Sequence, residues 1–267
     1  MLPLICLFDL LIGLIISIFS FKFNIGIELL IGLGFSILFL IIEGLIFFLI
    51  VIILSLPIKK NKRYKYSKFY AKLFLNYEKF VLRLFNVKKI FLGKDKMPND
   101  NFVLISNHKS NIDSFVIDSL LNKRLIFAAK KSLFNIPWFG KIIWRNNYLY
   151  ITRENHKKDV NELLYGIDLI NNDSYSIGIF PEGKRNFTDE PLLPFLNGYQ
   201  LLLNKTKKPL VIASIKETNE VKKNLFFKRH KVYFEIIKVL NSDEYLKMTR
   251  EELNDYCSNL IKNNLLK

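Results

Sequence analysis

The residues best suited to chemistry lie in one short stretch, Ser106 to Asp113, which follows the apolar run Phe102 to Ile105. An apolar run of this length bounded by polar residues predicts a buried strand. Asn107 and His108 should therefore lie on the turn at the carboxyl end of that strand, where open α/β sheets place their ligands.

Asp113 is spaced to support His108. Asn111 is a suitable N-cap for an apolar-periodic helix over Ile112 to Leu121, which would place Asp113 in its first turn. A carboxylate there can fix the imidazole tautomer and stabilise the imidazolium that forms when the ring takes a proton from a hydroxyl. The alternative is that both side chains only cap a helix.

A second turn, Phe180 to Arg185, also follows an apolar segment. Pro181 ends the strand because it has no N–H to donate, and Gly183 permits a positive φ. Glu182 and Arg185 would then lie at the carboxyl end of the strand, where the arginine fork suits a phosphate group. A structural turn with a local ion pair is the alternative.

A third stretch, Lys130 to Gly140, begins with two lysines, Lys130 and Lys131, at the end of a predicted strand. Its apolar continuation could line a groove for an acyl chain. An ordinary packed loop with solvated lysines would give the same pattern.

Other chemistries lack support. The sequence has no G-x-S-x-G elbow, Walker loop, dinucleotide fingerprint or zinc-ligand spacing, so we predict neither a metal nor a cofactor. Cys6 and Cys257 offer no disulfide framework, which favours a reducing compartment. His156 and His230 lie in charged runs and are predicted to be solvated, which leaves His108 as the candidate base.

Candidate strands alternate with helix-like segments after residue 89, a pattern typical of a layered α/β domain with a largely parallel sheet and flanking helices. The predicted strands are Ile90–Leu92, Phe102–Ser106, Arg124–Ala129, Tyr148–Thr152, Tyr175–Phe180, Leu210–Ile215 and Val232–Val239. The predicted helices are Ile112–Leu121, Val160–Ile170, Phe195–Leu203 and Asp243–Leu260. In such a sheet the three turns should meet at one rim.

The N-terminal part of the chain has a different composition. Residues 1–58 are almost uncharged apart from Asp9, Lys22, Glu28 and Glu43, so we predict a membrane anchor of one or two helices. Asp9 and Glu43 would lie at membrane depth and could face each other. Residues 59–89 are predicted as a basic amphipathic connecting segment, and 90–267 as the catalytic domain.

The net charge of +16 comes from 40 Lys and Arg against 24 Asp and Glu, and a basic cluster from Lys59 to Lys68 follows the apolar leader. By the positive-inside rule this flank, and with it the catalytic domain, is cytoplasmic. The interleaved tyrosines Tyr64 and Tyr66 suit the headgroup level of a membrane, and anionic lipid is the expected partner. Nucleic acid is the rival partner for such a cluster, and we expect none here. The helix that follows, to about Val87, is either docked on the domain or lies on the membrane.

With these residues in hand, the chain resembles the membrane glycerolipid acyltransferases, and most closely the lysophosphatidate acyltransferases. The resemblance spans about Ile90 to Ile215 and rests on four blocks in the family's order. These are Asn107-His108 with Asp113, Lys130 to Gly140 running on to Arg153, Phe180 to Gly183 with Arg185, and Pro194-Phe195 with Gly198 followed by Pro209-Leu210-Val211. Two positions depart from the family pattern: Lys184 replaces a threonine, and Ile212 stands where a second proline is usual.

The resemblance implies an enzyme that moves a fatty acyl group from acyl-CoA or acyl carrier protein to lysophosphatidate, which gives phosphatidate without a cofactor. His108 and Asp113 would be catalytic. Substrate-binding roles would fall to Asn107, Lys130, Lys131, Arg153, Glu182, Gly183 and Arg185. The alternatives are an acyltransferase for glycerol 3-phosphate or another lysophospholipid, and a membrane-anchored lipid-binding protein without catalysis.

Overall fold

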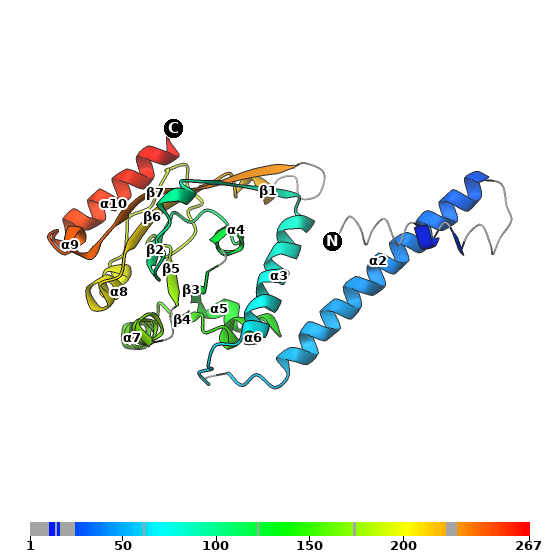
Figure 1. Ribbon diagram of the computed structural model, residues 1–267, viewed down its shortest axis with the longest axis horizontal. Coiled ribbons are helices and arrows are strands. Elements are labelled where there is room, and N and C mark those ends of the chain that lie inside the picture. The colour runs from blue at the N-terminus through cyan, green and yellow to red at the C-terminus, as the bar shows by residue number, and fades with distance from the viewer. Residues whose placement is uncertain are drawn as a thin grey trace. The chain divides into compact units, whose positions relative to one another are not determined.

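The computed structural model describes residues 11–13, 15–16, 25–60, 62–121, 123–172, 175–222 and 229–267 (Figure 1). These residues form two compact units, Met1–Lys59 and Lys60–Lys267. Most of the predicted first apolar helix, including Cys6 and Asp9, lies outside the described residues, so the suggested contact between Asp9 and Glu43 is untested.

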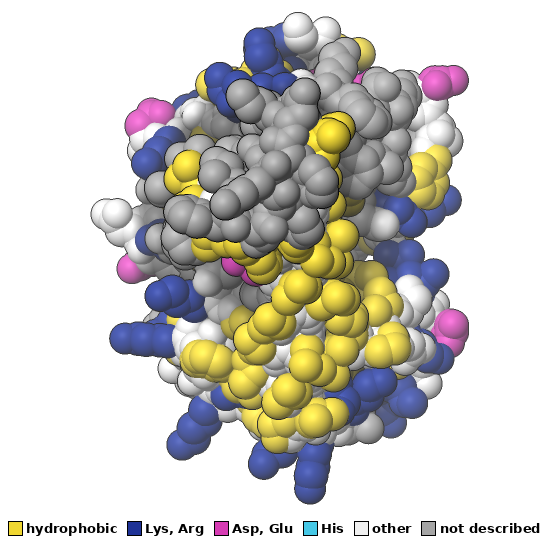
Figure 2. Space-filling model, turned by 90° about the vertical axis from the view of Figure 1, so that its right-hand side faces the viewer, with side chains coloured by type: hydrophobic (Ala, Val, Ile, Leu, Met, Phe, Trp, Pro, Cys, Tyr) yellow, Lys and Arg dark blue, Asp and Glu magenta, His cyan; other side chains and the backbone are white. Residues whose placement is uncertain are grey.

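The first unit is dominated by the helix α2, Ile25–Ser55. At 1.5 Å per residue its 31 residues extend about 46 Å, more than the roughly 30 Å of a bilayer core. The stretch Leu30–Ser55 is the one helix in the described part of the chain that is long and apolar enough to cross a membrane. Its large apolar side chains are exposed, and Figure 2 shows a face of the molecule on which hydrophobic side chains gather.

Small residues let a second helical segment approach α2 closely. Residues 11–13 are helical, and a Cβ added at Gly13 would collide with the backbone oxygen of Gly32 and the hydroxyl of Ser36. The Ser36 hydroxyl itself donates to the Gly32 carbonyl at 2.8 Å. Contacts between small residues of this kind are typical of helix pairs within membranes.

The second unit is built on a seven-stranded sheet in the order β1-β7-β6-β2-β5-β3-β4. The strands β2, β3, β4, β5 and β6 run parallel to one another, whereas β7 pairs antiparallel with β6 and parallel with β1. The strands are β1 Val87–Leu92, β2 Val103–Ile105, β3 Leu125–Lys130, β4 Leu149–Ile151, β5 Ser176–Ile179, β6 Leu210–Lys216 and β7 His230–Leu240. The predicted fold class, a largely parallel α/β sheet, is confirmed.

Helices cover the sheet in two layers (Figure 1). The helices α7, α8 and α10 pack along one side, where α7 contacts β4 and β5, α8 contacts β2, and α10 contacts β6. The other layer contains α3 and α4, with the short helices α5 and α6 beside them. The helices are α3 Lys68–Leu84, α4 Asp113–Leu121, α5 Lys131–Phe134, α6 Phe139–Arg145, α7 His156–Asn172, α8 Gly198–Thr206, α9 Ser242–Tyr245 and α10 Arg250–Leu265, with 3₁₀ turns at Lys94–Lys96 and Glu220–Lys222. The central strand β2 is fully buried between the two layers.

The helix after the basic cluster, α3, is docked on the domain. Phe74 is buried, and its ring lies 6.1 Å from that of Phe115 in α4. The chain before α3 is fastened too, because Arg63 lies over the Tyr165 ring at 3.9 Å and forms an ion pair with Glu162. The sequence suggested residues 59–89 as a connecting segment; from Lys60 on, this segment belongs to the same compact unit as the sheet.

Three local expectations differ from the structure. The stretch after Lys130 forms α5 and α6, separated at Trp138, where φ is 51°. The predicted helix over 243–260 is in fact two helices, α9 and α10, because a capping box at Thr249 starts a separate helix. His230 is only 5% exposed at the start of β7, so the prediction that it is solvated was wrong, whereas His156 is exposed.

Candidate active site

Asn107 extends the hydrogen-bonding pattern of β2 beyond the end of the strand. Its side-chain amide donates to the Ile215 carbonyl at 2.8 Å, and its Oδ1 accepts the Ile215 N–H at 2.8 Å. The residue is fully buried. Both polar ends of the side chain are thus bonded to β6, so Asn107 holds the turn in place and the geometry gives no support to the predicted contact with substrate.

His108 and Asp113 form a pair. The imidazole Nδ1 lies 2.8 Å from Asp113 Oδ2, and that oxygen also accepts the backbone N–H groups of Lys109 and Ser110, each at 2.8 Å. Asp113 is fully buried at the start of α4, whereas the His108 side chain is 20% exposed. Within the described chain no hydrogen bond occupies His108 Nε2, so that nitrogen is available at the surface of the site.

A stack of aromatic rings sets the plane of the imidazole. The His108 ring lies 4.1 Å from the Phe180 ring at 9° between planes, and Phe180 in turn stacks on Phe127 at 5.4 Å. Gly178 makes room for this stack, because a Cβ at that position would run into the Phe127 ring. The base is thereby held by a column of side chains that reaches into the sheet.

Glu182 fastens the turn after β5 to the His108 turn. Its Oε1 accepts the His108 N–H at 2.6 Å and its Oε2 accepts the Leu193 N–H at 2.9 Å. Burial raises the pKa of the Glu182 carboxyl, and these two backbone donors act against that rise. The Asn186 N–H donates to the His108 carbonyl at 2.7 Å, so both sides of the His108 backbone are tied to the same loop. Glu182 therefore positions the base, and its carboxylate oxygens are engaged by protein.

Arg185 presents a cation beside this turn. Gly183 adopts φ of 68°, which turns the chain at the end of β5, and the Arg185 guanidinium lies 4.8 Å from the ring of the exposed Phe187. No carboxylate pairs with Arg185 in the described residues. Because β5 is the neighbour of β2, this guanidinium lies in the turn that follows the strand next to β2.

Lys130, Lys131 and Arg153 lie at the same edge of the sheet but farther along it. Lys130 ends β3, Lys131 follows it, and Arg153 follows β4. These strands are two and three strands from β2, or about 10 and 14 Å at the usual strand spacing. Lys131 forms an ion pair of 3.3 Å with the exposed Glu154. The backbone N–H of Arg153, at φ of 63°, donates to Asp159 at 2.8 Å. The structure thus brings His108, Asp113, Glu182, Gly183 and Arg185 together and leaves these three cations at the periphery.

Sequence reasoning missed the contacts that connect the two turns. Phe180 supplies the stacking ring, Asn186 bonds the His108 carbonyl, and the Lys109 ammonium donates to the Glu190 carbonyl at 3.0 Å. Asn186 directly follows Arg185, and an asparagine after a glycine turn is a signal for local backbone hydrogen bonding. The contacts between turns, however, depend on strand order, which the spacing of residues does not give.

The arrangement can accept a proton at His108 Nε2 next to a cation suited to an anionic group. Among the described residues no cluster of three or more His, Cys, Asp or Glu side chains could hold a metal ion.

Comparison with known proteins shows what the whole chain is similar to. The sequence model of the acyltransferase family matches residues 89–216. The chain is 30% identical over 172 residues to the 1-acyl-sn-glycerol-3-phosphate acyltransferase of Haemophilus influenzae, covering 64% of this chain and 71% of that one. It is 24% identical to the enzyme of that name from Saccharomyces cerevisiae, covering 70% of this chain and 60% of the yeast protein. The fold is similar to the crystal structure of the 1-acyl-sn-glycerophosphate acyltransferase PlsC from Thermotoga maritima, with a TM-score of 0.58, 24% identity, and coverage of 73% of this chain and 80% of that one.

Proposed function

Since the chain belongs to the acyltransferase family, we propose that it transfers a fatty acyl group from a thioester donor to the free hydroxyl of 1-acyl-sn-glycerol 3-phosphate, giving phosphatidate. The observation that carries the proposal is the His108–Asp113 pair at 2.8 Å, with His108 Nε2 at the exposed side of the ring.

In the proposed reaction His108 Nε2 takes the proton of the acceptor hydroxyl as its oxygen attacks the thioester carbon. The Asp113 carboxylate accepts the Nδ1–H and stabilises the imidazolium that forms. When the tetrahedral intermediate collapses, the C–S bond breaks and the thiol leaves with the proton from Nε2. The sum is an ester and a free thiol, so the exchange needs neither an acyl-enzyme nor a cofactor.

Arg185 is the proposed ligand of the acceptor's phosphate. Its planar guanidinium can bind two phosphate oxygens at once, and it lies in the turn after β5, the strand next to β2. Lys130, Lys131 and Arg153 extend the positive charge along the same edge and would contribute at longer range to acceptor or donor. Either acyl-CoA or acyl carrier protein can supply the thioester in this scheme.

The proposed location of the enzyme is the membrane, with α2 as an anchor and the catalytic unit on the cytoplasmic face. The support is the apolar stretch Leu30–Ser55 followed by the basic cluster that starts at Lys59. Deletion of residues 1–58 should release the protein from membranes at high salt.

A panel of acceptors tests the proposed substrate. Purified protein should acylate 1-acyl-sn-glycerol 3-phosphate in preference to glycerol 3-phosphate and to lysophospholipids without a terminal phosphate. Arg185→Ala should weaken the use of lysophosphatidate by roughly 10- to 150-fold, because a hydrogen bond to a charged group contributes about 1.5 to 3 kcal/mol. The donor KM should change much less. An Arg185→Ala enzyme with unchanged acceptor kinetics would place the phosphate elsewhere.

A further inference from the structure

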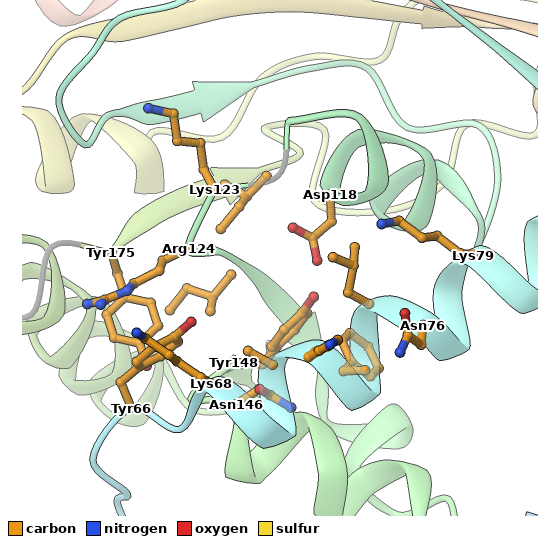
Figure 3. Close-up of a pocket in the computed structure, with 16 residues that line it drawn as sticks. Tyr66, Lys68, Asn76, Lys79, Asp118, Lys123, Arg124, Asn146, Tyr148 and Tyr175 are labelled. Atoms are coloured by element: carbon orange, nitrogen blue, oxygen red, sulfur yellow. The ribbon is translucent and has the colours of Figure 1, made fainter. Parts of the chain in front are cut away.

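A polar pocket lies at the amino ends of the parallel strands, whereas His108 lies at their carboxyl ends. It has a volume of about 480 Å³, and its lining includes the residues that begin β3 and immediately precede β4 and β5, such as Leu125, Tyr148 and Tyr175 (Figure 3). The helix α3 forms another wall. The six residues of β3 separate the amino ends of the strands from the carboxyl ends, where His108 lies, by about 16 Å at the usual rise per residue. None of the catalytic or substrate-binding residues described above lines the pocket.

The lining is strongly cationic. Lys68, Lys72 and Lys79 come from α3, and Lys123 and Arg124 precede β3. Within the described chain Lys68, Lys72 and Lys123 have no carboxylate partner. The only acid among the described lining residues is Asp118, and burial raises its pKa to about 7. Three of the five cations that line the pocket therefore have no carboxylate partner in the described part of the chain.

The aromatic and basic side chains at one end of the pocket are also suited to an anionic ligand. The Arg124 guanidinium stacks over the Tyr66 ring at 4.0 Å, and Tyr66 meets the Tyr175 ring edge-on at 6.0 Å. Lys68 reaches toward the same end of the pocket in Figure 3. A fork that is fixed by stacking, next to an ammonium group, is an arrangement that binds phosphate oxygens well.

The surroundings of the pocket indicate a lipid as the source of that phosphate. Its floor is apolar, with Phe74 and Ile126, so the ligand should carry apolar groups near its charge. The α3 wall also exposes Phe69 and Leu84, at 56% and 46%, among its lysines. Apolar side chains interleaved with lysines on an exposed helix suit the boundary between lipid headgroups and acyl chains. In the sequence, α3 follows the basic cluster that comes after the apolar α2.

We propose that this pocket is a second, non-catalytic site that binds the phosphate headgroup of an anionic glycerophospholipid. Lys68, Lys72 and Arg124 hold the phosphate oxygens, and the apolar floor receives the first carbons of the lipid. A phosphomonoester lipid such as phosphatidate, with up to two negative charges, fits the charge of the pocket best. The site would keep the catalytic unit on membrane regions rich in anionic lipid and does not depend on which acceptor the enzyme acylates.

Hydrogen exchange on the purified full-length protein in detergent micelles tests the site. The probes are dioctanoyl phosphatidate, dioctanoyl phosphatidylcholine and sn-glycerol 3-phosphate. The amides of residues 68–79 and 123–126 report on the pocket, and those of 106–113 report on the catalytic turn. The variant Lys68→Gln/Lys72→Gln removes two exposed charges from the pocket. The matched control is Lys88→Gln/Lys231→Gln, an exposed lysine pair adjacent on β1 and β7 and outside the pocket.

Phosphatidate should protect residues 68–79 and 123–126 in the wild type and in the matched control. The pocket variant should need at least roughly tenfold more phosphatidate for the same protection, because two charged groups that bind the phosphate are lost. Protection confined to residues 106–113, an unchanged titration in the pocket variant, or equal protection by phosphatidylcholine would overturn the site. Equal protection by sn-glycerol 3-phosphate would overturn the lipid as its ligand.

Discussion

The helix α4 carries two buried acids in different environments. Asp113, at its first position, is fully buried, and its Oδ2 receives three N–H donors from the turn that holds His108. Asp118, five residues later, is 8% exposed and faces Glu78, which is fully buried on α3. Neither oxygen of Glu78 has a hydrogen-bond partner among the residues that the structure describes.

Hydrogen-bond donors, rather than burial, separate these two environments. Donors aimed at an ionised carboxylate offset the cost of removing its charge from water. Asp113 has such donors, so it can orient a base. Burial raises the pKa of both Glu78 and Asp118, and for Glu78 the charge of Asp118 adds to the rise. The first acid belongs to the proposed chemistry, and the second pair belongs to the packing of α3 against α4.

The largest expected effect comes from removing the imidazole of His108, which Asp113 orients. His108→Ala should lower kcat by roughly 10²- to 10⁴-fold, the usual contribution of a positioned general base. The side chain lies at a partly exposed strand end, so folding and membrane insertion should be retained. A radiolabelled acyl-transfer assay on membranes with matched protein amounts measures this. Turnover near that of the wild type would remove His108 from the mechanism.

The comparison within α4 can be tested directly with one type of substitution at two sites. Asp113→Asn should reduce kcat by roughly 10- to 10³-fold. The neutral amide cannot stabilise the imidazolium, and its NH2 group cannot accept the N–H donors that the carboxylate accepts. Asp118→Asn, on the same helix and also buried, should change kcat by less than about threefold, since it touches no reacting group. Similar losses in both variants would show that α4 packing, and not the donors at Asp113, governs activity.

Glu182→Gln should have a smaller effect. The amide keeps one acceptor oxygen for the two backbone N–H groups of His108 and Leu193, so one of the two hydrogen bonds is lost. The loss of one hydrogen bond that positions the base should lower kcat by roughly tenfold and leave the acceptor KM near its wild-type value. A rise in acceptor KM at constant kcat would instead indicate that Glu182 contacts the substrate.

The smallest effect concerns stability against pH. An acid whose pKa is raised in the folded state keeps its proton while the unfolded chain has lost it, so stability falls as the pH rises from the ordinary pKa near 4 to the folded value. For Asp118 that window ends at about pH 7. Asp118→Asn should therefore lose less thermal stability than the wild type between pH 4.5 and pH 8. Unfolding midpoints that decline equally in both proteins would contradict a protonated Asp118.

The sheet was predictable because most of its strands, such as β2, β5 and β6, are short apolar runs with polar ends, and all seven predicted strands are present. The positions of the turns after β2 and β5 followed from the same signal. The helices α5 and α6 were missed because each is under eight residues and Pro137 lies between them, so neither shows a helical period. His230 was misjudged because its charged neighbours suggested a surface, while the residue itself is buried on β7.

The candidate site was only partly predictable. The proximity of His108 to Asp113 follows from their local spacing around a helix start. The engagement of Asn107 by Ile215, and of Glu182 by His108 and Leu193, depends on strand order and on loop closure across the chain. A polar residue at a strand end can therefore be recognised from sequence, but its partner, protein or substrate, is decided by the tertiary fold. The roles of the individual site residues stay predictions.

Because His108 stacks on Phe180 and Phe180 stacks on Phe127, the orientation of the imidazole depends on residues inside the sheet. Gly178 lies in β5, and its lack of a side chain leaves the space in which Phe127 supports Phe180 and Phe180 supports the imidazole. A side chain at this position would therefore displace the rings and, through them, the plane of the imidazole. Selection for catalysis acts on the interior of the protein as well as on its rim.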